Sequence, residues 1–345
     1  MSQSRTAVVL FNLGGPDSLE AVAPFLVNLF SDPAIIGLPQ PLRSLVARVI
    51  AWRRAPVARA IYQRLGGGSP LLANTEAQAR ALEAALGEGF RVFIAMRYWP
   101  PFSTEAVKAV KAWRPDAIVL LPLYPQASTT TTQSSFADWQ HAATAAGLGA
   151  STRALCCYPE EAGFIAALAG EIRDKLAGWP TGVAKRVLFS AHGLPQKIVD
   201  SGDPYPWQIE RTAAALRAAL AMPELDTVVC YQSRVGPLAW IGPSTDDEIR
   251  RAGRERVGLI VVPVAFVSEH SETLVELDRE YRHLAESAGV PRYERVPTVG
   301  TAPAFIAGLA RLVRAAPPGP CPVEGVRLCP AHFRRCLCVL AKAAA

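Results

Sequence analysis

The segment Val187-Leu188-Phe189-Ser190-Ala191-His192-Gly193-Leu194-Pro195 shows how this chain folds. The apolar run 187–189 is typical of a buried strand, and the glycine and proline after His192 predict a tight turn. The imidazole of His192 is therefore expected at the carboxyl end of a strand, where open α/β sheets bind ligands. Imidazole transfers protons readily near neutral pH, so His192 is a candidate general base. Taken alone, it could equally be an ordinary turn histidine.

Short apolar runs alternate with helical patterns along the whole chain. The predicted strands are 7–12, 90–95, 117–122, 152–157, 186–190, 227–231 and 258–263. The predicted helices are 18–30, 41–63, 74–86, 103–112, 134–146, 160–177, 206–221, 245–252, 272–287 and 302–314. This alternation indicates βαβ units and parallel sheets. We therefore predict an α/β fold of two similar doubly wound, Rossmann-like domains, 1–150 and 151–315, followed by a cysteine-rich tail, 316–345. The last helix could pack back on the first domain.

The composition is that of a large globular protein. Of the 345 residues, 50% are hydrophobic and 19% are charged, which is ample for two cores. The sequence contains no uninterrupted apolar stretch of membrane-spanning length, and residues 1–6 lead straight into a predicted strand without a signal peptide. We therefore expect a cytoplasmic protein.

The positive charge is concentrated in residues 40–64, which contain six arginines and no acidic residue. Apolar residues, Trp52 among them, are interleaved with the arginines. A basic, apolar helix of this kind is typical of contact with an anionic membrane surface, here the inner membrane, or of the lip of an apolar pocket. A phosphate-binding face and a simple exposed helix are the alternatives. No nucleic-acid motif is present, so we expect no nucleic-acid partner.

A second candidate region follows the predicted strand 258–263. Ser268 is a plausible N-cap, and Glu272 and Glu276 are four residues apart, which places both carboxylates on one face of a helix. Like charges at this spacing repel, and each raises the pKa of the other. The pair therefore indicates cation binding or proton transfer. An acidic first turn that complements the helix dipole is the alternative.

Three cysteines stand close together in the tail: Cys329, Cys336 and Cys338. Disulfides are rare in the cytoplasm, so the spacing indicates a metal or iron–sulfur site, with zinc as the simpler alternative. A fourth ligand is needed, and both Cys321 and the Cys156-Cys157 pair are available. Neighbouring strand residues face opposite ways, so we expect only one of that pair to reach the cluster.

These motifs together resemble the ferrochelatase family along nearly the whole chain. The resemblance is carried by 12–16, 32–39, 66–71, 96–98, 123–126, 190–195, 202–206, 231–237, 240–243 and 268–281. It implies two chelatase-like domains and an enzyme that inserts Fe²⁺ into protoporphyrin IX to form protohaem, the terminal step of haem biosynthesis. A cobalt or nickel chelatase, a coproporphyrin-specific enzyme, and a non-enzymatic iron–sulfur sensor or haem-binding protein are the rival interpretations.

The resemblance also assigns roles to residues. His192 matches the active-site histidine and Glu272 its partner acid, and both are implied to meet the iron. The residues implied to line the pocket or the proton path are His270, Glu276, Leu13, Ser69, Arg97, Tyr98, Tyr124 and Trp240. The tail resembles that of ferrochelatases with a [2Fe-2S] cluster, which implies Cys329, Cys336 and Cys338 as ligands with Cys156 or Cys157. Because iron stays ferrous in the reaction, we expect this cluster to have a structural or sensing role.

Overall fold

The computed structural model describes residues 4–234, 236, 238–317, 319–320 and 326–338. The chain divides into two compact units. The first holds the described residues of Met1–Cys157, Ala310–Leu328 and Leu337–Ala345, and the second holds Tyr158–Leu309 and Cys329–Cys336. The domain limits predicted from the sequence remain a prediction.

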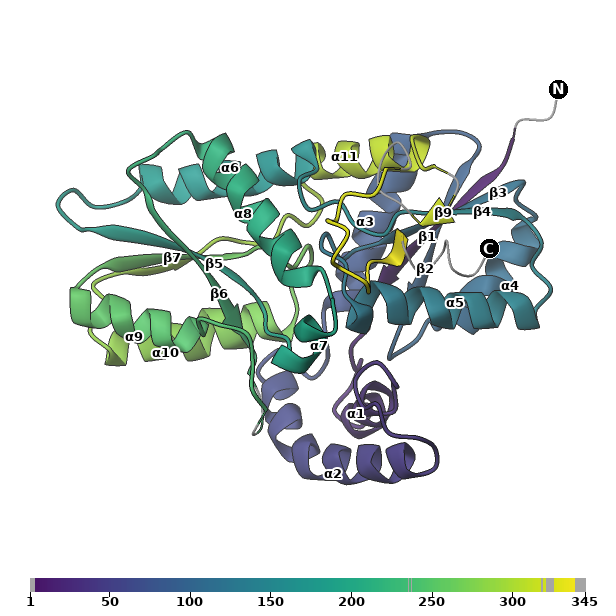
Figure 1. The fold of residues 1–345 in the computed structure, drawn as a ribbon, viewed down its shortest axis with the longest axis horizontal. Coiled ribbons are helices and arrows are strands. Elements are labelled where there is room, and N and C mark those ends of the chain that lie inside the picture. The colour runs from purple at the N-terminus through teal and green to yellow at the C-terminus, as the bar shows by residue number, and fades with distance from the viewer. Residues whose placement is uncertain (1–3, 235, 237, 318, 321–325, 339–345) are drawn as a thin grey trace. The chain divides into compact units, whose positions relative to one another are not determined.

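The first unit is built on a parallel sheet with strand order β2-β1-β3-β4-β9. Its strands are β1 Thr6–Asn12, β2 Phe90–Met96, β3 Ala117–Pro122, β4 Ser151–Ala154 and β9 Gly319–Pro320. Its helices are α1 Val22–Phe30, α2 Leu42–Gln63, α3 Leu71–Leu86, α4 Ser103–Trp113, η1 Thr129–Gln133 and α5 Ser134–Ala145. Helix α11, Pro303–Arg314, begins in the second unit, and its residues from Ala310 belong to the first. Figure 1 shows the elements in chain order.

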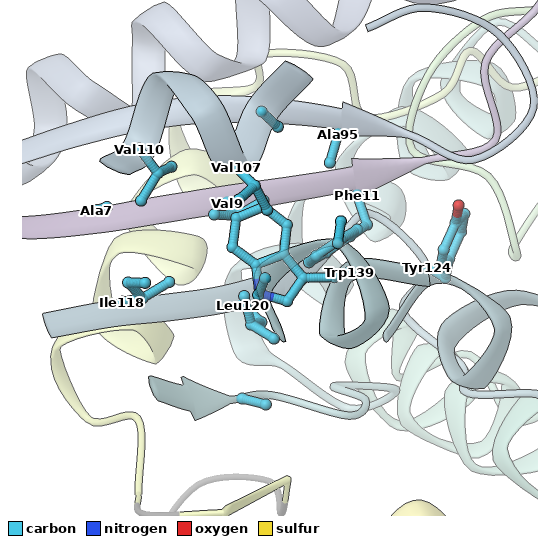
Figure 2. Packing of buried hydrophobic residues seen from close by; sticks show 14 residues of the cluster. Ala7, Val9, Phe11, Ala95, Val107, Val110, Ile118, Leu120, Tyr124 and Trp139 are labelled. Carbon is cyan, nitrogen blue, oxygen red and sulfur yellow. The ribbon is translucent and has the colours of Figure 1, made fainter. Parts of the chain in front are cut away.

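The core of the first unit packs around β1, which pairs with a strand on each side. Figure 2 shows Trp139 of α5 lying against Phe11 of β1, and the two rings meet edge-on with centroids 5.9 Å apart. Both side chains are almost fully buried. Burial of such a side chain contributes about 1.5–3 kcal/mol, so this packing fixes the end of β1 and the loop that follows it.

The second unit has a parallel sheet with strand order β6-β5-β7-β8. Its strands are β5 Lys185–His192, β6 Asp226–Gln232, β7 Gly258–Pro263 and β8 Tyr293–Arg295. Its helices are α6 Ala162–Ala177, α7 Gln196–Asp200, α8 Tyr205–Leu220, α9 Thr245–Glu255, η2 Glu272–Glu280 and α10 Tyr281–Ser287. Every residue of β7 is buried, as expected for a strand of a parallel sheet covered on both faces.

The α/β fold with two parallel, doubly wound sheets is confirmed, but several predicted boundaries are wrong. The strand predicted at 152–157 ends at Ala154, and β8, β9, α7 and η1 were not predicted at all. All four missed elements are short, and a run of two to five residues carries too little periodicity to stand out. Within the described residues, no helix combines the length and apolar character needed to cross a membrane.

Candidate active site

His192 ends β5, beside Gln232 at the end of β6. The next residue, Gly193, donates its backbone N–H to the Gln232 carbonyl at 2.9 Å. A Cβ atom on Gly193 would lie 2.9 Å from that oxygen and 3.3 Å from Cε3 of Trp240. Only glycine therefore fits this turn without a shift of backbone. Trp240, implied by the resemblance to line the pocket, packs directly against the turn that carries His192.

The imidazole of His192 is paired with the carboxylate of Glu272. The Nδ1 and Oε2 atoms are 2.9 Å apart, and the side chains are 40% and 28% exposed. Burial alone would lower the pKa of His192, but the Glu272 charge outweighs it and raises that pKa above 6.5. Burial opposes ionisation of Glu272, yet its hydrogen bond and attraction to His192 hold the pKa of Glu272 below the ordinary value. The pair therefore favours an ionised carboxylate.

A hydroxyl joins Glu272 to the second carboxylate. The Oγ atom of Ser233 lies 2.6 Å from Oε2 of Glu276 and 3.2 Å from Oε2 of Glu272. Burial and the neighbouring Glu272 charge raise the pKa of Glu276 to about 7. The backbone N–H of Ser233 and the hydroxyl of Tyr281 hold the other oxygen of Glu276, at 2.9 and 3.0 Å. Ser233 was not singled out from the sequence, since a lone serine after a strand carries no pattern.

The helix that carries the two carboxylates differs from the prediction. Residues Glu272–Glu280 form a π-helix, η2, with i→i+5 hydrogen bonding, and the α-helix α10 starts only at Tyr281. The N-cap position is taken by Ser271, so the prediction of Ser268 as N-cap is wrong. A π-helix is rare and occurs mostly at functional sites, and its wider turn brings Tyr281, five residues along, to Glu276.

His270 is buried next to this helix. Its Nδ1 atom lies 3.1 Å from the carbonyl oxygen of Ser268, and its ring lies 4.6 Å from that of Phe266. A carbonyl only accepts, so Nδ1 carries the hydrogen, and burial lowers the pKa of His270. His270 is therefore a neutral imidazole with Nε2 as its acceptor.

In the first unit, three of the predicted pocket residues lie on loops that meet. The backbone N–H of Tyr98 donates to the carbonyl of Leu13 at 2.8 Å, which joins the loops after β2 and β1. Ser69 donates its backbone N–H to Pro16 at 2.7 Å, and a Cβ atom on Gly15 would lie 2.5 Å from the Ser69 hydroxyl. Leu13, Ser69 and Tyr98 thus gather at the carboxyl ends of two parallel strands.

Arg97 belongs to a buried ionic network that the sequence did not reveal. Its guanidinium lies 2.9 Å from Oδ2 of Asp32 and 2.7 Å from the Ser134 hydroxyl. Asp32 also accepts from the Tyr98 hydroxyl at 2.9 Å, and it is only 3% exposed. Tyr124, also implied to line the pocket, lies in the hydrophobic core shown in Figure 2.

The cysteines that could serve as cluster ligands belong to both units. In the first unit, Sγ of Cys156 lies 3.5 Å from Sγ of Cys157 and 3.9 Å from Sγ of Cys338. In the second unit Cys329 and Cys336 are buried, and Gln208 donates to the Cys329 sulfur at 3.2 Å. Cys156 and Cys157 lie beyond the end of β4, so the strand alternation used to separate them does not apply. Cys321 is outside the described residues.

Within the described part of the chain, no three His, Cys, Asp or Glu side chains are grouped to hold a metal ion. Cys230 is a fully buried thiol in β6, and burial raises its pKa to about 12. It is unsuited to act as a thiolate ligand or a nucleophile.

The family profile described as ferrochelatase matches residues 5–316. The chain belongs to the ferrochelatase family. It is 57% identical over 317 residues to the ferrochelatase of Caulobacter vibrioides strain NA1000 / CB15N, covering 90% of each chain. It is 55% identical over 349 residues to that of Phenylobacterium zucineum strain HLK1, covering 97% of this chain and 98% of the relative. As a ferrochelatase, it is a metal chelatase that inserts ferrous iron into a porphyrin in the terminal step of haem biosynthesis.

Among solved structures, this ferrochelatase is similar to the sirohydrochlorin chelatase SirB from Bacillus subtilis subspecies spizizenii in complex with cobalt. The TM-score is 0.53 at 12% identity, and the match covers 90% of this chain and 94% of that one. At this identity the likeness shows the fold alone.

Proposed function

We propose that this ferrochelatase inserts Fe²⁺ into protoporphyrin IX with His192 as proton acceptor and Glu272 as its partner acid, both of which also meet the iron. The observation that carries the proposal is the 2.9 Å pair between Nδ1 of His192 and Oε2 of Glu272. An ionised carboxylate accepts from Nδ1–H, so the neutral imidazole presents the lone pair of Nε2. The side chain is 40% exposed, so this nitrogen is accessible to a ligand.

Two pyrrole protons must leave the porphyrin as iron enters. A proton taken by Nε2 of His192 makes an imidazolium, which the adjacent Glu272 charge stabilises. The Nδ1 proton can then pass to Glu272, and from there through the Ser233 hydroxyl to Glu276 when that carboxyl is ionised. The porphyrin proton then remains on Nε2, so His192 can accept the second proton only after Nε2–H releases its proton to solvent, to which the side chain is 40% exposed. His270, which is neutral and lies two residues before Glu272 in the chain, adds an acceptor nitrogen to the same path.

The test is insertion of Fe²⁺ into protoporphyrin under anaerobic conditions, followed by absorbance, with porphyrin binding measured separately by fluorescence quenching. His192→Ala should abolish insertion and leave porphyrin binding largely intact. His141→Ala is the matched control, because His141 lies on α5 in the other unit. Near-normal turnover of His192→Ala would exclude the assignment. The same assay with coproporphyrin, Co²⁺ and Ni²⁺ separates the rival substrates.

We also propose that the porphyrin is held by the side chains implied by the resemblance: Leu13, Ser69, Arg97, Tyr98, Tyr124 and Trp240. The convergence of the loops carrying Leu13, Ser69 and Tyr98 supports this role for the first three. Trp240 is supported by its contact with the turn after His192, and its indole Nε1 is buried without a hydrogen-bond partner among the described residues.

A [2Fe-2S] cluster is proposed for the tail, held by Cys329, Cys336 and Cys338 with a fourth cysteine. A tetrahedral metal with bonds of about 2.3 Å to sulfur places two thiolates about 3.8 Å apart. The 3.9 Å separation of the Cys156 and Cys338 sulfurs fits that spacing, which supports Cys156 over Cys157. When bound, such a cluster supplies crosslinking between segments and sensitivity to oxidants.

Cys156→Ser should remove the visible absorbance of anaerobically purified protein, and Cys157→Ser should keep it. Cys230→Ser is the control, because that thiol lies in β6, where the hydroxyl of Thr245 donates to it. Wild-type protein purified anaerobically without visible iron–sulfur absorbance would contradict the cluster itself.

Peripheral contact with a membrane is proposed for α2, and with it a cytoplasmic location at the inner membrane. Leu42, Leu45, Val49 and Trp52 follow three- and four-residue spacing and so form one stripe of the helix. They are 48%, 59%, 43% and 76% exposed. Arginines flank the stripe, as in helices that lie on anionic lipid.

Vesicles of phosphatidylglycerol and phosphatidylcholine should co-sediment the wild-type protein at low salt. Leu45→Ala combined with Trp52→Ala should reduce the bound fraction several-fold. Met222→Ala, an exposed apolar residue of the second unit, is the control. Equal sedimentation of all three proteins would contradict membrane contact through α2.

A further inference from the structure

An open pocket of about 460 Å³ lies on the first unit, lined by three arginines and two aromatic residues. The arginines are Arg5, Arg91 and Arg114, and the aromatic residues are Phe93 and Trp113. Neither the reaction nor any of the proposals above uses these side chains. The volume lies within the range of small-molecule sites.

The charge of this pocket is uncompensated. Among the described residues, no carboxylate forms a salt bridge with the guanidinium of Arg5, Arg91 or Arg114. The carboxylate of Asp116 accepts from the backbone N–H of Arg5 at 2.7 Å, not from its guanidinium. Three cations thus line one cavity without a carboxylate bound to their guanidinium groups. Guanidinium groups bind carboxylate and phosphate oxygens through paired hydrogen bonds.

Two of the guanidinium groups are stacked on aromatic rings. The Cζ atom of Arg5 lies 4.4 Å from the ring centre of Trp113, and that of Arg91 lies 5.5 Å from the ring centre of Phe93. The two rings are 6.0 Å apart and tilted by 60°. Such stacking leaves the N–H edges of a guanidinium free and offers its flat face to a planar ligand.

The walls of the pocket are fixed. Phe93 and Trp113 pack against the hydrophobic core of Figure 2. The carbonyl of Arg5 accepts from the backbone N–H of Asp116 at 2.8 Å. This hydrogen bond joins the residue before β1 to the residue before β3. A rigid frame lowers the entropy cost of binding. The pocket therefore has the features of a preformed site.

The pocket is distinct from the predicted porphyrin site. Arg5 precedes β1 and Arg91 lies at the start of β2, whereas Leu13 and Arg97 follow the opposite ends of those strands. With a rise of about 3.3 Å per residue, the length of β1 separates the two places by roughly 20 Å.

From the three unpaired guanidinium groups and the two aromatic rings, we infer that this pocket is a second, non-catalytic site for a planar aromatic molecule that carries two or more carboxylates or phosphates. Two sources have this chemistry: a nucleoside polyphosphate, and a tetrapyrrole with its propionate groups, such as the haem product.

Titration calorimetry with three probes tests the site: ATP, protohaem, and inorganic pyrophosphate, which has the charge without the ring. For a nucleotide site, ATP should bind at least about tenfold more tightly than pyrophosphate. For a tetrapyrrole site, protohaem should bind with a stoichiometry of two, one equivalent being taken by the active site.

Arg91→Glu with Arg114→Glu should weaken ATP binding at least about tenfold, the loss expected for a charge-assisted pair, or reduce the haem stoichiometry to one. Lys108→Glu is a charge-reversal control, because Lys108 lies on the same helix as Trp113 but outside the pocket. Circular dichroism and iron insertion should be unchanged in both variants. Should the glutamate variant not fold, Arg91→Gln with Arg114→Gln serves in its place.

Three results would overturn the inference. They are the absence of ATP binding at millimolar concentration together with a single haem site, unchanged binding in the double variant, and pyrophosphate binding as tight as that of ATP together with a single haem site. The last would reduce the pocket to a simple anion site.

Discussion

The hydroxyl of Ser233 lies 2.6 Å from the Glu276 carboxylate, and from that place it also reaches Glu272 at 3.2 Å. A hydroxyl has one proton, so it can donate to one carboxylate while it accepts from the other. The low pKa of Glu272 and the high pKa of Glu276 indicate the resting arrangement. In that state, protonated Glu276 donates to Ser233, and Ser233 donates to ionised Glu272.

Ser233→Ala should therefore slow iron insertion about 100-fold, the lower end of the range for a lost proton-transfer group. The unfolding midpoint should change little, because only one hydroxyl is removed from a partly exposed site. Single-turnover insertion and thermal unfolding measure the two effects. Ser201→Ala, which removes an exposed hydroxyl near α7, is the control. A wild-type rate for Ser233→Ala would show that proton transfer between Glu272 and Glu276 does not need the Ser233 hydroxyl.

Glu276→Gln should change how stability depends on pH. The pKa of Glu276 is raised from 4.5 to about 7 in the folded protein, so its favourable contribution is present below pH 4.5 and is lost as pH rises to about 7. After solvent screening we expect a loss of about 1–3 kcal/mol over this window in the wild type. The glutamine variant should lack it.

Urea unfolding of the metal-free protein at pH 5, 6, 7 and 8 measures the difference between the two proteins. The raised pKa of His192 acts in the same direction above pH 6.5, and the Glu276 charge contributes to it, so the two proteins are compared most directly between pH 5 and 6. Parallel stability curves would show that Glu276 is already ionised at pH 5.

The two acidic partners of Arg97, Asp32 and Asp138, should contribute differently to the stability of the folded protein. Asp32 is 3% exposed and also holds Tyr98 and Ser134. Asp32→Asn removes a buried charge from this network and should destabilise the protein by about 3 kcal/mol or more. Asp138 lies 3.5 Å from the same guanidinium and is 33% exposed, so Asp138→Asn should cost less than about 1 kcal/mol. Chemical denaturation measures both, and equal effects would contradict the assignment.

Gly193→Ala should displace the turn that holds His192. The new Cβ atom would lie 2.9 Å from the backbone oxygen of Gln232, which cannot move without disturbing β6. A misplaced imidazole reduces turnover strongly, so we expect a loss of at least about 100-fold in insertion rate. Gly149→Ala, where nothing lies within 4 Å, is the control. Normal activity of Gly193→Ala would show that the turn adapts.

The sequence predicted those parts of the fold and site that depend on local pattern. The strand before His192 is a buried apolar run, and glycine and proline mark the turn after it. The sequence alone therefore predicted that His192 lies at the carboxyl end of a strand. The partnership of Arg97 and Asp32 could not, because the two residues are 65 positions apart and belong to no shared pattern. The π-helix was missed for a different reason. The spacing of Glu272 and Glu276 suits an α-helix as well, and only packing decides between the two hydrogen-bond patterns.

The π-helix η2 makes the site more sensitive to some kinds of mutation than to others during evolution. Each i→i+5 turn accommodates one more residue than an α-helical turn, so the alignment of Glu276 with Ser233 and Tyr281 depends on chain length as well as on side chains. Substitutions alone leave that register in place. A single-residue deletion between Glu272 and Glu276 would rotate one carboxylate away from the other at once. The backbone of η2 is therefore less sensitive to point mutation than to insertions and deletions.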